Sequence, residues 1–167
     1  ISVTNQSDKP IFVRVYTEGA TNGNETAYQN GVGLKVEYTN LDYNRIDASA
    51  LAQGTNFLAL IEVTNLSSND LDNLALEYII PSGWEIIDKR TEDRTNSNHY
   101  IPDYQDVRDD KVYSYINHLP VGKKVIIEMT LCATYSGKYI LPSTRIEAMY
   151  NHTTRANTAG TWVEVKQ

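Results

Sequence analysis

The sequence predicts an all-β protein built as an antiparallel β-sandwich. Apolar and polar residues alternate with a period of two in many short runs, which is typical of half-buried strands. Clusters of Gly, Asn and Asp separate these runs and permit the backbone angles that hairpins need. No run shows the apolar spacing of an amphipathic helix. About nine short strands at this spacing indicate two packed antiparallel sheets.

Individual runs predict where each strand lies in the sandwich. Residues 57–63, FLALIEV, are apolar on both faces, as a central strand would be. Residues 33–38, GLKVEY, are expected to turn Leu34, Val36 and Tyr38 inward. The apolar runs at 74–80 and 125–131 each contain one glutamate, Glu77 and Glu128, which is expected to face solvent. Further strands are expected at residues 11–16, 112–116, 138–142, 145–150 and 161–165.

Turns are expected between these runs, at TNGNET, AQGTN, LSSND, PSGW, PVGKK, YSGK and NHTTRANTAG. Trp84, which follows PSG, and Trp162, in TWVEV, are expected to anchor the core. The longest irregular segment spans residues 88–110. Loops of that length in a compact domain are often functional or interfacial.

The length of 167 residues suits one well-cored domain. A polar, glycine-bearing segment at residues 18–31 suggests a boundary. Residues 1–20 therefore supply a strand that either completes a preceding domain or begins this one, and residues 21–167 form the main domain. Because the chain opens on a strand-like run without Met or signal peptide, we expect it to be a piece of a longer protein. The isolated domain is expected to be monomeric.

The composition excludes several function classes. The formal net charge is −6, and no basic cluster exceeds Lys123–Lys124, so nucleic acid is not an expected partner. The single cysteine, Cys132, cannot form an internal disulfide, and in an apolar strand it predicts a small buried side chain. Twelve tyrosines suit half-buried strand positions and interfaces. They favour a carbohydrate platform, a docking face, or simply a polar β-protein surface.

An acidic segment, YQDVRDDKVYSYI, poses the sharpest functional question. Its cluster comprises Asp103 just before the segment, then Asp106, Arg108, Asp109 and Asp110. Calcium prefers several oxygens on a glycine-bearing turn, and here no glycine is present and Arg108 intervenes. Acid–base catalysis needs carboxylates facing each other across a cleft. The favoured interpretation is structural: Arg108 bonds to a carboxylate, and Asp109 or Asp110 caps a turn before the next strand.

No other residues assemble into a reactive site. His99, His118 and His152 are far apart and lack partners at metal-ligand spacing. PSGWE does not match the G-x-S-x-G pattern of a nucleophile elbow. The sequence therefore predicts a protein that is not an enzyme, with no catalytic residue, no metal and no cofactor.

Three blocks occur in an order that resembles one protein family. They are IIPSGWEIIDKR at 79–90, DYQDVRDDKVYSY at 103–115, and LCATYSGKYILPSTRIEAMYN at 131–151. With the spacer LAQGTNFLALIEVTN and the ending AGTWVEV, they are similar to the C-terminal region of bacterial alpha-2-macroglobulin family proteins. The resemblance covers nearly all of residues 11–165. It implies a macroglobulin-like domain, with an immunoglobulin-like two-sheet architecture.

The resemblance also implies a function. Such proteins are large protease traps of the bacterial periplasm or cell envelope, often lipid-anchored. Their macroglobulin-like domains accompany a helical thioester domain, whose Cys–Gln thioester can acylate a protease that cleaves a bait segment. The chain is then expected to be a non-catalytic C-terminal domain that docks on sister domains, especially the thioester domain. Target proteases would be partners only of the full-length protein.

The chain lacks the C-x-E-Q thioester motif, because ATY follows Cys132. The bait and thioester chemistry must therefore lie elsewhere in the parent protein. The resemblance implies that an aromatic side chain of the final domain shields the thioester, and the matching position is Tyr150, with Met149 beside it. The alternative is that one of these two side chains belongs to the core. A rival function is a free-standing carbohydrate-binding or adhesin module, with coplanar exposed aromatics and calcium at Asp103–Asp110.

Overall fold

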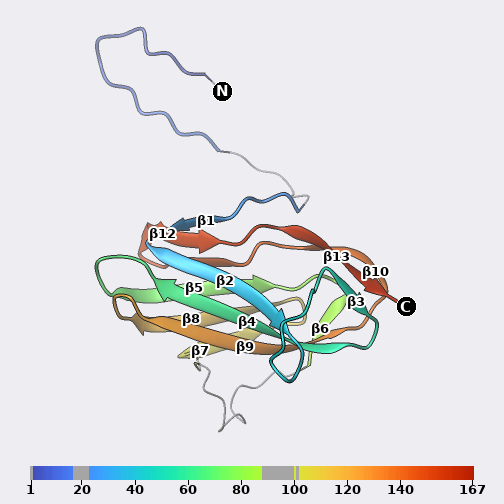
Figure 1. Cartoon of the computed structure of the whole chain (residues 1–167). Helices are drawn as coiled ribbons and strands as arrows, with labels where there is room; N and C mark the ends of the chain where they lie inside the picture. Colours follow the sequence, from blue (N-terminus) through green and yellow to red (C-terminus); the bar gives the residue numbers. More distant parts are fainter. Residues whose placement is uncertain (1, 17–22, 88–99, 101) are drawn as a thin grey trace.

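The computed structural model describes residues 2–16, 23–87, 100 and 102–167, and these residues form a β-sandwich (Figure 1). Among them no helix is long and apolar enough to cross a membrane. The strands are β1 (Tyr28–Asn30), β2 (Val32–Thr39), β3 (Ala50–Ala52), β4 (Asn56–Asn65), β5 (Leu71–Ile79), β6 (Trp84–Ile86), β7 (Tyr104–Val107), β8 (Lys111–Leu119), β9 (Lys124–Ala133), β10 (Gly137–Leu141), β11 (Arg145–Ala148), β12 (Asn151–Asn157) and β13 (Thr161–Lys166).

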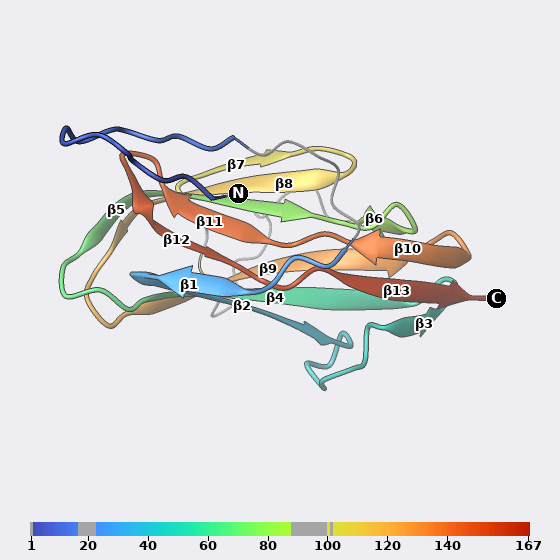
Figure 2. The same cartoon turned by 90° about the horizontal axis from the view of Figure 1, so that it is seen from above.

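The strands of the described residues form three sheets (Figure 2). A six-stranded sheet has the order β1-β12-β11-β5-β8-β7, and a four-stranded sheet has the order β2-β4-β9-β6. A three-stranded sheet, β10-β13-β3, includes one parallel pair, β13 with β3; the other pairs are antiparallel. Inward-facing side chains from all three sheets share one hydrophobic core. The predicted antiparallel sandwich is confirmed, and the parallel pair is an addition to it.

Strand β4 lies at the centre of the four-stranded sheet, between β2 and β9. This position explains why residues 57–63 are apolar on both faces. Phe57 packs edge-to-face on Trp84, with ring centroids 4.9 Å apart, and Tyr38 packs edge-to-face on both rings. The hydroxyls of Tyr38 and the fully buried Tyr78 lie 3.4 Å apart, and burial raises the pKa of Tyr38 to about 12. Both tyrosines therefore stay neutral inside the core.

The PSGW turn requires its glycine because an aromatic ring lies against it. Trp84 N donates to Pro81 O (2.9 Å), and Gly83 O accepts from the backbone N–H groups of Thr134 and Tyr135. A Cβ atom built on Gly83 would overlap the ring of Tyr139. The turn thus fixes the entry into β6 and places Trp84 in the core, where it is only 2% exposed.

Two predicted segments differ from the structure. Residues 11–16 are not a strand: they are extended without ladder partners, and Phe12 is fully exposed. Alternation describes a segment that can pair, but a strand also needs a neighbour to supply hydrogen bonds. Conversely, the expected turn NHTTRANTAG contains β12. Its residues 155–157 are paired with β1 on one side and with β11 on the other, and Asn151 also pairs with Ala148 of β11. Residues 88–99, part of the expected long loop, lie outside the described residues, and β7 occupies 104–107.

Three predicted side-chain positions also need correction. Glu128 does not face solvent but is 8% exposed, and its Oε2 accepts a hydrogen bond of 2.9 Å from Tyr43 Oη. This hydrogen bond offsets part of the cost of burying the carboxylate, and sequence alternation does not reveal it. Trp162 is 55% exposed and does not anchor the core, because β13 turns Val163 and Val165 inward instead. Cys132 is half-buried in β9.

We predict that Gly83→Ala destabilises the fold by about 1–3 kcal/mol, because the new methyl group forces the Tyr139 ring or the turn to move. Urea unfolding of the variant and the parent sequence measures this difference. The same substitution made in a Tyr139→Ala background should cost less, since the ring is then gone. Equal stability of Gly83→Ala and the unmodified chain would contradict the packing described.

We also predict a pH-dependent contribution from the β5–β8 pair Asp72–His118. His118 Nδ1 lies 2.7 Å from Asp72 Oδ1 and Nε2 lies 3.7 Å from Asp70 Oδ2. The hydrogen bond to Asp72, followed by the charges of Asp72 and Asp70, raises the pKa of His118. Because the folded pKa exceeds the unfolded value, protonated His118 stabilises the fold below about pH 6.5, and this stabilisation is lost as pH rises through the folded pKa.

The effect is small because these side chains are largely exposed. Urea unfolding across pH 5 to 9 should show a loss of stability on the alkaline side that His118→Gln reduces. Asp72→Asn should flatten the same part of the profile. An unaltered slope in both variants would refute this contribution.

Candidate functional site

The strongest candidate site is the tip of the β11–β12 hairpin. Met149 and Tyr150 are its two turn residues, between Ala148 at the end of β11 and Asn151 at the start of β12. Their exposed fractions are 45% for Met149 and 84% for Tyr150, and neither belongs to the core. The tip therefore presents an aromatic ring and a thioether to whatever lies beyond this end of the sandwich.

Hydrogen bonds hold the backbone of this tip in place. Met149 N donates to Asn73 O (2.9 Å), which ties the turn to the neighbouring strand β5. Asn73 has a left-handed backbone, with φ 55°, a conformation that asparagine tolerates better than most residues. On the other side, Asn151 Oδ1 accepts from Thr153 Oγ1 (2.6 Å), and Asn151 Nδ2 donates to Thr154 Oγ1 (3.2 Å). Tyr150 is thus exposed on an ordered support.

The acidic segment is divided between the two ends of β7. At one end, Arg108 Nε and Nη2 donate to Asp106 Oδ2 at 3.1 and 3.0 Å, and Arg108 N donates to Lys111 O (2.9 Å). Asp109 and Asp110 lie in the β7–β8 turn, where Asp110 O accepts from Ile80 N (3.0 Å). This end of the segment closes a hairpin and ties it to the end of β5.

At the other end, Asp103 Oδ2 accepts from Tyr100 Oη (2.7 Å) and Asn117 N (2.8 Å). These bonds, with that from Asn117 N the largest cause, lower the pKa of Asp103. Burial and the neighbouring Asp103 raise the pKa of Tyr100 to about 12. Asp103 is therefore used to fix the entry into β7. Within the described part of the chain, no group of three His, Cys, Asp or Glu residues is arranged to hold a metal.

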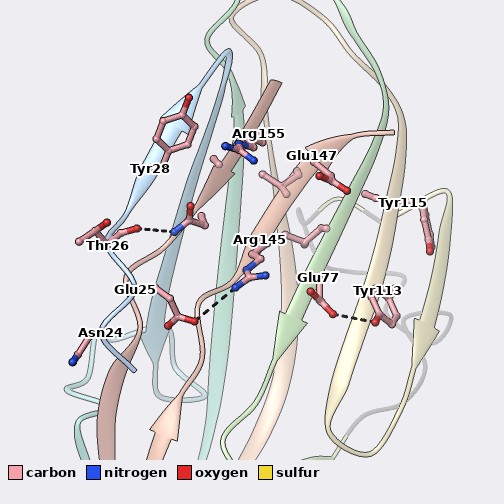
Figure 3. A pocket seen from close by; sticks show the side chains of 15 residues that line it. Asn24, Glu25, Thr26, Tyr28, Glu77, Tyr113, Tyr115, Arg145, Glu147 and Arg155 are labelled. Carbon is pink, nitrogen blue, oxygen red and sulfur yellow. Dashed lines mark hydrogen bonds and ion pairs between the residues drawn. The ribbon is translucent and has the colours of Figure 1, made fainter. Parts of the chain in front are cut away.

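A third feature, which the sequence did not predict, is a groove on the outer face of the six-stranded sheet (Figure 3). Its volume is about 810 Å³, and β1 with the residues before it forms one wall. Cross-strand partners bring polar and aromatic side chains into two rows. One row is Tyr28, Asn157, Arg145, Glu77 and Tyr113, and the other contains Arg155, Glu147, Ala75 and Tyr115.

Polar contacts order the side chains along this groove. Arg145 Nη2 lies 3.7 Å from Glu25 Oε1, and Tyr113 Oη donates to Glu77 Oε1 (3.0 Å). The guanidinium of Arg155 lies 5.4 Å from the centre of the Tyr28 ring, within cation–π distance. The twelve tyrosines of the sequence are compatible with such a face but do not locate it. Only the strand register, which joins residues from five strands, shows where it lies.

Two neighbouring tyrosines of the six-stranded sheet are not coplanar, as the platform of the rival carbohydrate-binding function would need. Tyr104 and Tyr115 lie with ring centroids 5.8 Å apart and planes inclined by 39°. Tyr113 has the Arg108 guanidinium 5.5 Å and the Lys111 ammonium 5.4 Å from its ring centroid. The side chains of Arg108 and Lys111 thus already lie against the Tyr113 ring, on which a sugar would have to stack.

Comparison with solved structures identifies the same fold in bacterial alpha-2-macroglobulins. A tyrosine-to-glycine mutant of Salmonella alpha-2-macroglobulin matches with a TM-score of 0.76 and 18% identity, over 89% of this chain and 10% of that chain. Native Escherichia coli alpha-2-macroglobulin, spanning domain MG7 to the C-terminus, matches with a TM-score of 0.74 and 17% identity, over 89% of this chain and 25% of that one. Both likenesses confirm the predicted sandwich.

Sequence comparison agrees. An alpha-2-macroglobulin homolog of Yersinia pestis is 23% identical over 156 residues, 80% of this chain but only 8% of that protein. The chain thus spans a small part of its curated relative, so this domain sits in a larger polypeptide with sister domains. Alpha-2-macroglobulins are protease inhibitors, which confirms the prediction of a non-enzyme. The family model of the bacterial alpha-2-macroglobulin MG10 domain matches residues 31–152, and the chain belongs to this family.

Proposed function

We propose that this chain is a docking domain of a broad-spectrum protease inhibitor, and that the β11–β12 tip covers a thioester in a sister domain. One observation carries the proposal: Tyr150 is 84% exposed on a turn whose backbone is hydrogen-bonded to β5. A large aromatic side chain held in solvent by an ordered support is typical of an anchor at an interface. Because the turn is pre-ordered, little conformational entropy is lost on docking.

The chemistry of a thioester suits this tip. A thioester hydrolyses when water reaches its carbonyl carbon, so a contact that excludes water prolongs its lifetime. The flat ring of Tyr150 and the adaptable thioether of Met149 can cover such a bond together. Burying one side chain of this size contributes about 1.5–3 kcal/mol. A cover of that strength keeps water out, yet opens when the sister domain moves.

The rest of the proposed function belongs to the parent protein. Proteases that cleave the parent are its proposed targets, and the periplasm or cell envelope is its proposed location, with a lipid anchor on the parent. The chain itself contributes surface rather than chemistry, since it lacks the C-x-E-Q motif. Its wider contribution is to hold the thioester domain in the uncleaved arrangement and to release it after cleavage of the bait.

We predict that Tyr150→Ala in the full-length parent accelerates spontaneous release of the thioester thiol by about 10- to 100-fold, in line with loss of about 1.5–3 kcal/mol of contact. Release of the thiol is followed with a chromogenic disulfide reagent. Tyr150→Phe keeps the ring and should retain most of the lifetime. Tyr135→Ala is the matched control, because Tyr135 is 54% exposed in the turn between β9 and β10. That turn lies at the end of the sandwich opposite to the β11–β12 tip (Figure 2).

An unchanged thiol lifetime in Tyr150→Ala would reject the shielding function. The parent's own sequence offers an earlier test, since a C-x-E-Q motif upstream of this domain is required. Its absence would also reject shielding and would leave the tip as a docking contact alone.

A further inference from the structure

The segment that precedes the sandwich carries an apolar pattern with nothing against it. Ile11, Val13 and Val15 alternate with Phe12, and all four are at least 50% exposed, Phe12 completely. The segment stands clear of the sandwich, beyond β1 and β12 (Figure 1). Soluble proteins rarely leave such a strand-like, apolar run in water, because its backbone and side chains favour pairing with another sheet. We therefore expect this segment to pair with strands of another folded domain.

A short tether limits where that domain can lie. The described part of the main domain begins at Gly23. Two hydrogen bonds hold the residues that follow it: Gly160 N donates to Glu25 O (3.0 Å), and Asn157 Nδ2 donates to Thr26 O (2.8 Å). These bonds fix residues 23–28 as the wall of the groove. From Tyr16 to Gly23 the chain can reach at most about 25 Å when fully extended. Any domain that contains residues 10–16 must accordingly lie beside the groove wall.

The groove offers that domain a suitable surface. It is about 810 Å³ in volume and is lined by Tyr28, Tyr115, Arg145 and Arg155 together with acidic side chains, including Glu77. Tyrosine and arginine are enriched at protein–protein contacts, whereas lysine is depleted. Opposite charges alternate across the strands, so the face complements a polar protein surface of mixed charge rather than a polyanion.

We propose that the domain immediately upstream in the parent polypeptide docks over this groove, and that residues 10–16 are a strand of that domain. The tether raises the effective concentration of the two surfaces, so a modest contact suffices to hold them together. Contacts between domains of one chain are typically of moderate size and polar, which the groove matches. The proposal rests on family membership for the upstream domain, but not on thioester shielding.

The test uses the full-length parent with a photoreactive residue in the groove. Tyr115→p-benzoylphenylalanine is irradiated, and the cross-linked peptides are identified by mass spectrometry. The expected partner peptide lies in the domain directly before residue 10. The matched control position is Lys35, on the outer face of the four-stranded sheet, where no cross-link to that domain is expected. A cross-link from position 115 to any other domain, or none, overturns the proposal.

Charge reversal and footprinting provide a second measurement. Arg145→Glu combined with Arg155→Glu should lower the cross-link yield from position 115 at least several-fold, whereas Lys35→Glu should not. Thermal unfolding of the 167-residue chain checks that each variant remains folded.

In hydroxyl-radical footprinting, Phe12 and Tyr28 should oxidise several-fold more slowly in the parent than in the isolated chain, while Tyr135 should not change. Equal oxidation of Phe12 and Tyr28 in both forms overturns the proposal.

The outcomes separate this interface from the shielding function. If Tyr150→Ala alters the thiol lifetime, but the photoreactive residue at position 115 forms no cross-link to the upstream domain, only the upstream interface is rejected. The converse result rejects only the shielding of the thioester.

Discussion

The burial of β4 between β2 and β9 is the constraint on which the rest of the structure depends. Ladders along both edges of β4 satisfy its backbone groups, so its apolar side chains can be buried without unpaired polar atoms. Phe57 on β4 then meets Trp84 and Tyr38, and these rings pack in the same core as the inner face of the six-stranded sheet. Because that sheet is fixed by the core, its outer groove and its hairpin tip take defined positions.

Strands whose pattern reflects burial were predictable from the sequence. Residues 57–63 and 125–131 show this best, since a strand inside a sandwich must be apolar wherever neighbours cover it. Residues 11–16 have an equally regular pattern but form no strand in the described chain, because pairing depends on a partner that local sequence does not encode. Strand β12 was missed for the opposite reason: its Asn and Thr residues are turn formers, and two flanking strands override that preference.

The candidate sites were predictable to different degrees. Tyr150 was singled out through a family resemblance, and local physics alone left open whether Met149 or Tyr150 entered the core. The acidic segment was interpreted as structural from residue chemistry, and Arg108 does lie in hydrogen-bond contact with Asp106. The groove could not be foreseen, because Tyr28, Glu77 and Arg155 are far apart in sequence and meet only through strand register. Glu128 shows the same limit, since its buried carboxylate accepts a hydrogen bond from a tyrosine in a distant loop.

The short length of β1 has a mechanical consequence. This strand has three residues, lies at the margin of its sheet and is the first paired element after the upstream tether. A pulling force from the N-terminal side acts first on the few hydrogen bonds of residues 25–26 and β1. It reaches the long ladder between β2 and β4 only after these bonds break. Because β1 pairs with β12 at three residues, whereas β2 pairs with β4 at eight, β1 has far fewer ladder contacts to lose than the interior strands.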